Sequence, residues 1–93
     1  MIKTNEYFDG KVKSLTLEAE GGPATIGVIS AGEYEFGTAT VEVMKIVSGS
    51  IDALLPGSDQ WKNFKGGTEF TVEKNLKFKV RAQGDVSYLC LYK

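Results

Sequence analysis

Alternation of apolar and charged side chains is the feature of this sequence that most constrains its fold. In residues 76–81 (LKFKVR), Leu76, Phe78 and Val80 alternate with three cations, which is typical of a strand with one face buried and the other in water. Turn-like segments recur along the chain, which holds eleven glycines and two prolines, and no stretch shows a helical period with caps. The pattern therefore predicts an all-β antiparallel sandwich or barrel. The predicted strands are residues 12–18, 24–30, 33–36, 41–47, 51–55, 68–73, 76–81 and 86–92, and residues 60–64, around Trp61, are expected to be irregular.

The composition limits the classes of function. Ninety-three residues make one domain, residues 1–93, and the net charge of −1 comes from interspersed charges of both signs. Without a basic face, we expect no nucleic-acid partner. No apolar run reaches the roughly 18 residues of a membrane span, so we expect no membrane partner and a cytoplasmic protein. The lone Cys90 is interpreted as a small buried hydrophobe rather than as a thiolate, which needs a neighbouring cation.

The spacing between Glu42 and Gly49 gives a more specific indication. Six residues separate them, between two predicted strands. This arrangement resembles the second half of the first cupin motif, G-x5-H-x-H-x3,4-E-x6-G. The resemblance implies a single-domain, cupin-type antiparallel β-barrel with a jelly-roll-like arrangement of strands.

The same alignment shows what this chain lacks. The two histidine positions of the first motif fall on Phe36 and Thr38, and that of the second motif, laid on Gly67, falls on Phe78. The chain contains no histidine. A divalent metal needs about four to six N, O or S ligands, so Glu42 alone cannot hold one. We therefore expect a protein that works without a metal.

Longer strings of sequence resemble one particular family. Together they are similar to the small bacterial pyrimidine/purine nucleoside phosphorylases, and the resemblance runs nearly end to end. It implies a homodimer that uses inorganic phosphate as co-substrate, needs no cofactor, and converts purine and pyrimidine nucleosides to free base and ribose 1-phosphate. The strings are residues 5–14 (NEYFDGKVKS), 32–39 (GEYEFGTA), 47–49 (VSG), 54–56 (LLP) and 87–90 (SYLC).

Glu42 is the candidate catalytic residue. In the cupin alignment its side chain points into the barrel, where burial raises the pKa of a carboxyl group that has no cation partner. A protonated Glu42 could protonate the leaving base, and an ionised one could bind ribose hydroxyls or stabilise a positively charged sugar. The competing interpretation is a glutamate on a solvated strand face.

Five further residues are candidates for substrate binding. Phe36 and Phe78 form an apolar wall for a nucleobase, or simply part of the hydrophobic core. Thr38 donates a hydrogen bond to phosphate or ribose, or else stabilises a turn. Tyr34 shares the strand face of Phe36 and either contacts the ligand or closes the core. Lys11 follows a glycine at a possible anion-binding nest of backbone N–H groups.

Two other classes of protein remain open. A cupin that binds a small ligand without catalysis would also explain the missing metal ligands. A dimerisation module would need no pocket at all, and its barrel interior would be apolar and filled. Release of free base that depends on phosphate distinguishes the enzyme from the binding protein.

Overall fold

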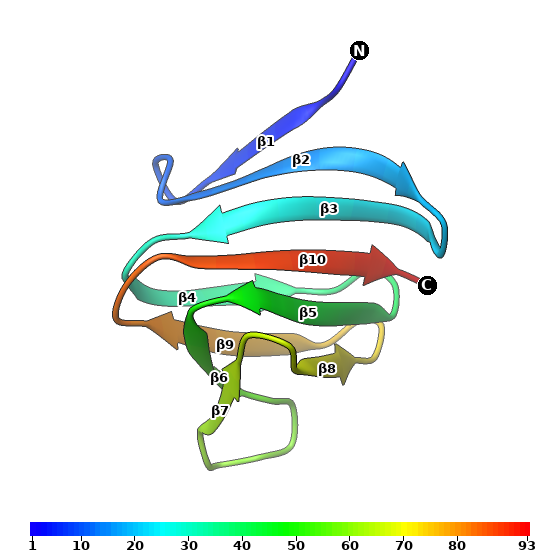
Figure 1. Cartoon of the computed structure of the whole chain (residues 1–93). Coiled ribbons are helices and arrows are strands. Elements are labelled where there is room, and N and C mark those ends of the chain that lie inside the picture. Colours follow the sequence, from blue (N-terminus) through cyan, green and yellow to red (C-terminus); the bar gives the residue numbers. More distant parts are fainter.

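A computed structural model describes residues 1–93 as ten strands without a helix (Figure 1). All strand pairs are antiparallel, in a six-stranded sheet of order β1-β2-β3-β10-β5-β8 and a four-stranded sheet of order β4-β9-β6-β7. The chain thus has no helix that is long and apolar enough to cross a membrane. The strands are β1 Thr4–Tyr7, β2 Val12–Ala19, β3 Gly22–Ile29, β4 Gly32–Gly37, β5 Glu42–Ser48, β6 Ser50–Leu54, β7 Lys62–Lys65, β8 Glu69–Val72, β9 Lys77–Ala82 and β10 Val86–Tyr92.

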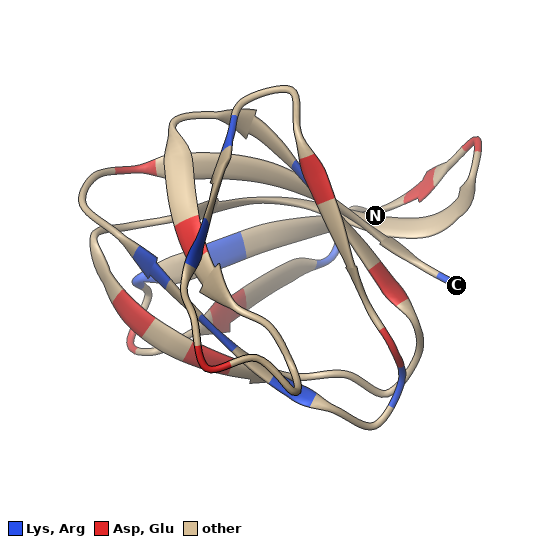
Figure 2. Ribbon diagram, turned by 90° about the horizontal axis from the view of Figure 1, so that it is seen from below, with Lys and Arg blue, Asp and Glu red and all other residues tan.

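The two sheets face each other across one hydrophobic core of sixteen buried residues. Figure 1 shows β4 and β9 lying behind β10 and β5. Strand β9 buries Phe78, Val80 and Ala82 while the residues between them stay exposed, as the alternation in the sequence predicts. Positions of both charges are interspersed along the chain, with no region of the ribbon taken by one sign alone (Figure 2). The prediction of an all-β antiparallel fold is confirmed.

The barrel is not closed, which corrects the sequence-based expectation. Strands β1 and β8 are the edges of the larger sheet, and β4 and β7 are those of the smaller one. The larger sheet has two more strands than the smaller one and extends past it. Its edge strand β1 pairs with β2 alone. Figure 1 shows β1 projecting from the upper edge with the N-terminus pointing away. The result is a jelly-roll-like sandwich of two facing sheets.

Local predictions near the C-terminal half also need correction. Residues 60–64 are not irregular throughout, because β7 pairs with β6, and the Asn63 amide donates to the Asp52 carboxylate at 3.0 Å. Leu76 does not share the buried face of Phe78. It precedes β9, directly after Asn75 with its φ of 62°, and its side chain is 40% exposed. Strand β1 was not predicted at all.

The backbone conformation at position 49 explains why a glycine stands there, at this spacing after Glu42. It joins β5 to β6 with a φ of +82°, and a Cβ added there would lie 2.8 Å from the carbonyl oxygen of Asp85. A positive φ strains any residue with a side chain, and a backbone oxygen cannot rotate away. Gly49 therefore lets the chain leave one sheet, enter the other, and pass close to the β9–β10 turn.

We predict that Gly49→Ala destabilises the fold by about 1–3 kcal/mol, the usual cost of such a strained backbone position. Urea unfolding followed by circular dichroism measures the change. Gly84→Ala is the matched control, because Gly84 lies in the neighbouring turn with nothing within 4 Å of its added Cβ. Equal stabilities for the two variants would contradict this role for Gly49.

Candidate functional site

A pocket of about 570 Å³ opens between the two sheets. One side is formed by inward-facing residues of β2, β5 and β10, and the other by residues of β4 and β9. Nine of its fourteen lining residues are hydrophobic, and the charged ones are Glu35 and Glu42. A ligand in this space would meet a mostly apolar surface with a few polar groups, as is usual for small-molecule sites.

Glu42 lies in this pocket at the start of β5. It is half-buried and shares the inward face of its strand with the buried Met44 and Ile46. The Cys90 thiol donates a hydrogen bond to its Oε1 at 3.5 Å. Burial raises the pKa of Glu42 above its ordinary value, and the hydrogen bond from Cys90 opposes that rise. Glu42 thus has the environment of a carboxyl group that holds its proton more tightly than one in water.

Cys90 stays a neutral thiol in this arrangement. Burial and then the nearby charge of Glu42 raise the pKa of Cys90 to about 12. The group therefore donates its hydrogen to Glu42 instead of forming a thiolate, and its side chain is buried in the core. This placement agrees with the interpretation of Cys90 as a small buried hydrophobe.

Aromatic rings form the wall of the pocket on the smaller sheet. The rings of Phe36 and Phe78 lie 5.8 Å apart between centroids, and both residues line the pocket. Phe8, in the β1–β2 turn, packs its ring edge-on against Phe36 at 5.6 Å and is 43% exposed. The pocket wall is therefore partly an accessible aromatic surface, on which a flat ring could stack.

Three of the predicted substrate-binding residues do not line the pocket. The Tyr34 hydroxyl donates to two carbonyl groups of the β3–β4 turn, each at 3.0 Å. The Thr38 hydroxyl donates to the carbonyl of Glu73 at 2.7 Å and accepts from the N–H of Leu76 at 3.1 Å. Lys11 is exposed in the β1–β2 turn. The structure thus brings together Glu42, Phe36 and Phe78 and leaves these three outside.

Sequence reasoning also missed residues that do line the pocket. Ser14, Tyr88 and Tyr92 face inward from β2 and β10, and Phe8 reaches the rim from its turn. The alternation within residues 86–92 carried the signal for the two tyrosines, since every second residue of a strand shares one face. No such pattern exists for Phe8, which has a φ of 54° in a turn.

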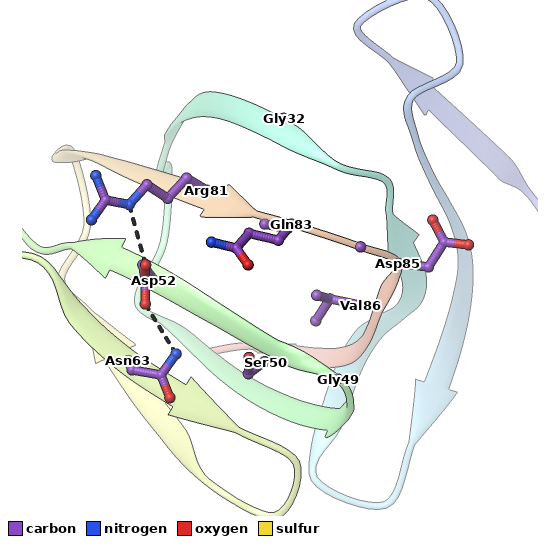
Figure 3. Close-up of a pocket in the computed structure, with 11 residues that line it drawn as sticks. Gly32, Gly49, Ser50, Asp52, Asn63, Arg81, Gln83, Asp85 and Val86 are labelled. Carbon is purple, nitrogen blue, oxygen red and sulfur yellow. Dashed lines mark hydrogen bonds and ion pairs between the residues drawn. The ribbon is translucent and has the colours of Figure 1, made fainter.

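A second hollow, of about 430 Å³, lies at the opposite ends of β5 and β10 (Figure 3). Asp52 accepts hydrogen bonds from Arg81 at 3.2 Å and from Asn63 at 3.0 Å, and so joins β9, β6 and β7. Those two bonds lower the pKa of Asp52. The guanidinium of Arg81 also stacks on Trp61 at 4.1 Å. These groups are occupied with one another, so we assign them to holding the strands together.

No group of three or more His, Cys, Asp or Glu side chains is placed to hold a metal ion. The positions that the cupin motifs give to metal-binding histidines are taken by Phe36, Thr38 and Phe78. Phe36 and Phe78 line the pocket, and the Thr38 hydroxyl is hydrogen-bonded to the carbonyl of Glu73.

The arrangement of strands is that of the cupin class. A cupin superfamily protein from Desulfitobacterium hafniense superposes with a TM-score of 0.72 over 98% of this chain and 82% of its own, at 14% identity. The chain belongs to the pyrimidine/purine nucleoside phosphorylase family, whose model matches residues 2–92. A relative of that name from Pseudomonas paraeruginosa is 54% identical over the full length of both chains. The solved structure of a protein of unknown function from Vibrio parahaemolyticus has a TM-score of 0.92 at 38% identity, covering 97% of this chain and 96% of its own.

The raised pKa of Glu42 predicts a pH-dependent cost to stability. Because its pKa is raised on folding, the protonated Glu42 favours the folded state at low pH. That contribution to the free energy of unfolding is lost as pH rises through the folded-state pKa. Glu42→Gln keeps the hydrogen-bond acceptor but removes the ionisation. We therefore expect the stability of the variant relative to the native chain to increase as pH rises above 4.5, the ordinary pKa of this carboxyl group, as measured by urea unfolding. Glu35→Gln, which alters an exposed carboxylate of the same pocket, is the control; a pH-independent difference for Glu42→Gln would contradict the expectation.

Proposed function

We propose that this chain is a cytoplasmic nucleoside phosphorylase that acts on purine and pyrimidine nucleosides. It transfers the sugar to inorganic phosphate and releases free base and ribose 1-phosphate, with no metal or other cofactor. Membership of the family supports the class of reaction. The single observation that carries the proposal is the half-buried Glu42 facing an aromatic wall in a pocket of about 570 Å³, a size typical of small-molecule sites.

The aromatic wall favours tolerance for different bases. The partly buried Phe36 offers an aromatic surface without hydrogen-bonding groups, and the buried Phe78 packs against it at 5.8 Å between ring centroids. Stacking on such rings is available to every nucleobase, because each has a π-face. A site that relies on stacking therefore accepts purines and pyrimidines alike, whereas a site that reads the base edge would discriminate.

The chemical step assigns Glu42 the role of general acid. A phosphate oxygen forms a bond to C1′ of the sugar while the bond from C1′ to the base nitrogen breaks. The electron pair of that bond goes to the base, which takes a proton from the Glu42 carboxyl group. Solvent then returns a proton to Glu42. A raised pKa favours the protonated form that a general acid needs.

Phosphate would meet a pocket without a cation of its own. The charged lining residues are Glu35 and Glu42, so the anion would have to be bound by neutral groups. The negative charge of phosphate would raise the pKa of Glu42 further, which favours its protonated form. The same lack of a cation supports the alternative function, a cupin that binds an uncharged ligand without catalysis.

Release of free base separates these two functions. We expect uridine, adenosine and inosine to release base when phosphate is present and to remain intact when it is absent, as measured by liquid chromatography. The native chain must be compared with Glu42→Ala to exclude a contaminating phosphorylase. Binding of nucleoside without base release would favour the non-catalytic alternative.

The role of Glu42 predicts the kinetics of Glu42→Gln. The variant keeps the size and hydrogen-bonding reach of the side chain but cannot donate the carboxyl proton. Turnover should fall by about 100-fold or more, the usual worth of a positioned acid. If Glu42 instead anchors the ribose, the effect will appear mainly in KM. Unchanged values of both on a folded variant would remove Glu42 from the site.

Metal independence is tested by chelation. The positions of the usual cupin ligands hold Phe36, Thr38 and Phe78, none of which provides a histidine-type ligand. We expect turnover to survive prolonged dialysis against EDTA followed by assay in metal-free buffer. Loss of turnover that one divalent metal restores would show that the proposal of a metal-free reaction is wrong.

We also propose that the protein is a homodimer, joined through the outer face of the larger sheet. On β2 and β3, Leu15, Ile26 and Val28 are 46%, 49% and 48% exposed, and Leu15 lies directly opposite Ile26. A chain of this length buries only about 60–65% of its unfolded surface by itself, so a partner adds stability. A second copy would cover the same face by two-fold symmetry.

Light scattering should give the mass of a dimer at micromolar concentration. Ile26→Glu should convert the dimer to a monomer, because two-fold symmetry would bury the new charge close to the same charge of the second copy. Leu76→Glu is the control, since Leu76 is 40% exposed but lies in the β8–β9 turn. A monomeric native chain, or a dimer unaffected by Ile26→Glu, would contradict this interface.

A further inference from the structure

Gly27 allows an unusual position of the Tyr88 side chain. Gly27 lies on the inward face of β3, directly between Ser14 of β2 and Tyr88 of β10. A Cβ added to Gly27 would lie 2.6 Å from both Cζ and Oη of Tyr88 and 2.7 Å from the carbonyl oxygen of Lys13. The phenol ring therefore lies across β3 in the space that a side chain would fill, and its hydroxyl points toward β2.

Polar side chains of β1 and β2 lie beside that hydroxyl. The Asn5 amide, on the edge strand β1, donates to Ser14 Oγ at 3.2 Å and to Thr16 Oγ1 at 3.0 Å. Burial raises the pKa of Tyr88 to about 12, and the neighbouring Ser14 hydroxyl opposes that rise as a hydrogen-bonding group. The Tyr88 hydroxyl therefore keeps its hydrogen and stays neutral across the physiological range of pH.

Tyr88 lies in the lining of the proposed substrate site. Tyr88 and Ser14 line the same pocket as Glu42, and Tyr88 precedes Cys90, the partner of Glu42, by two residues on one strand face. Side chains two residues apart on a strand are about 7 Å apart. The pocket therefore offers two separate polar points on the larger sheet, facing the aromatic wall of the smaller one. This spacing suits a ligand with one polar end at Glu42 and hydroxyl groups further along.

We propose that the Tyr88 hydroxyl binds a sugar hydroxyl of the nucleoside, and that Asn5 and Ser14 are positioning residues that orient it. The proposal rests on the function proposed above and assigns the sugar to the part of the pocket beside β1 and β2. It gives the projecting edge strand β1 a role in the site. It also explains the glycine at position 27, because a larger residue there would displace the phenol ring.

Tyr88→Phe tests the contact with the sugar. The hydroxyl is removed while the ring remains, so kcat/KM for uridine should fall about tenfold, the usual worth of one neutral hydrogen bond in a binding site. The same comparison is made with the 2′-, 3′- and 5′-deoxy analogues of uridine. For the analogue that lacks the contacted hydroxyl, native chain and variant should be equal. An equal loss with all three analogues, or no loss with uridine, would overturn the proposal.

Asn5→Ala tests the positioning role. We expect KM for uridine to rise several-fold with little change in kcat, and the double variant Asn5→Ala/Tyr88→Phe to be no worse than Tyr88→Phe alone. Glu6→Ala is the matched control on the same strand, because the exposed Glu6 contacts only the exposed Lys13 as an ion pair. Additive losses in the double variant would show that Asn5 acts through the fold and not through Tyr88. Gly27→Ala is unsuitable, since it also meets the backbone at Lys13.

Measuring nucleoside binding in the absence of phosphate tests the role of Tyr88 separately from the proposed phosphorylase activity. Calorimetric titration of uridine in the absence of phosphate should show the same weakening for Tyr88→Phe and the same insensitivity to the decisive deoxy analogue. If the native chain binds uridine but releases no base, the phosphorylase function fails and the binding constants still decide the role of Tyr88. A native chain that binds no nucleoside overturns both.

Discussion

The pairing of β10 with both β3 and β5 is the constraint on which the rest of the structure depends. Because the strand is paired on both sides, its alternation sends Tyr88, Cys90 and Tyr92 inward and the leucines between them outward. The same register puts Gly27 opposite Tyr88 and Glu42 opposite Tyr92. A slip of one residue would move every one of these groups to the other face. The chemistry of the pocket is thus fixed by backbone pairing.

Within that frame, polar groups in the apolar interior are satisfied by one another. Glu42 accepts a hydrogen bond from the Cys90 thiol, and the Tyr92 hydroxyl is hydrogen-bonded to the Thr25 hydroxyl at 2.9 Å. No buried side-chain nitrogen or oxygen lacks a partner. Unpaired polar groups would each cost about 1–3 kcal/mol there, so such pairs let an apolar pocket keep polar groups. A ligand in the pocket has to add to these hydrogen bonds or replace them.

The sequence predicts much of this arrangement, and its failures have a common physical cause. Alternation identifies the main strands and puts Glu42, Phe36 and Phe78 on inward faces, because side-chain direction follows directly from strand periodicity. The alternation does not tell whether a hydroxyl group already has a hydrogen-bond partner. The Thr38 hydroxyl is hydrogen-bonded to the carbonyl of Glu73, far along the chain, and the Tyr34 hydroxyl is hydrogen-bonded within a turn. Neither residue lines the pocket.

Other features depend on tertiary contacts that no local pattern encodes. Strand β7, KNFK, carries little β-propensity and is held by its pairing with β6 and by the bond from Asn63 to Asp52. Phe8 reaches the pocket rim from a turn residue with a positive φ. The same holds for the open edges of the sandwich, since the alternation does not tell whether the sheet closes.

The most direct test of the central claim is a crystal structure of the protein with a bound nucleoside. The account predicts the base against Phe36 and Phe78, within hydrogen-bonding distance of Glu42, in the pocket between the sheets. A nucleoside seated in the polar hollow beside Asp52 and Arg81, with the pocket between the sheets empty, would contradict it.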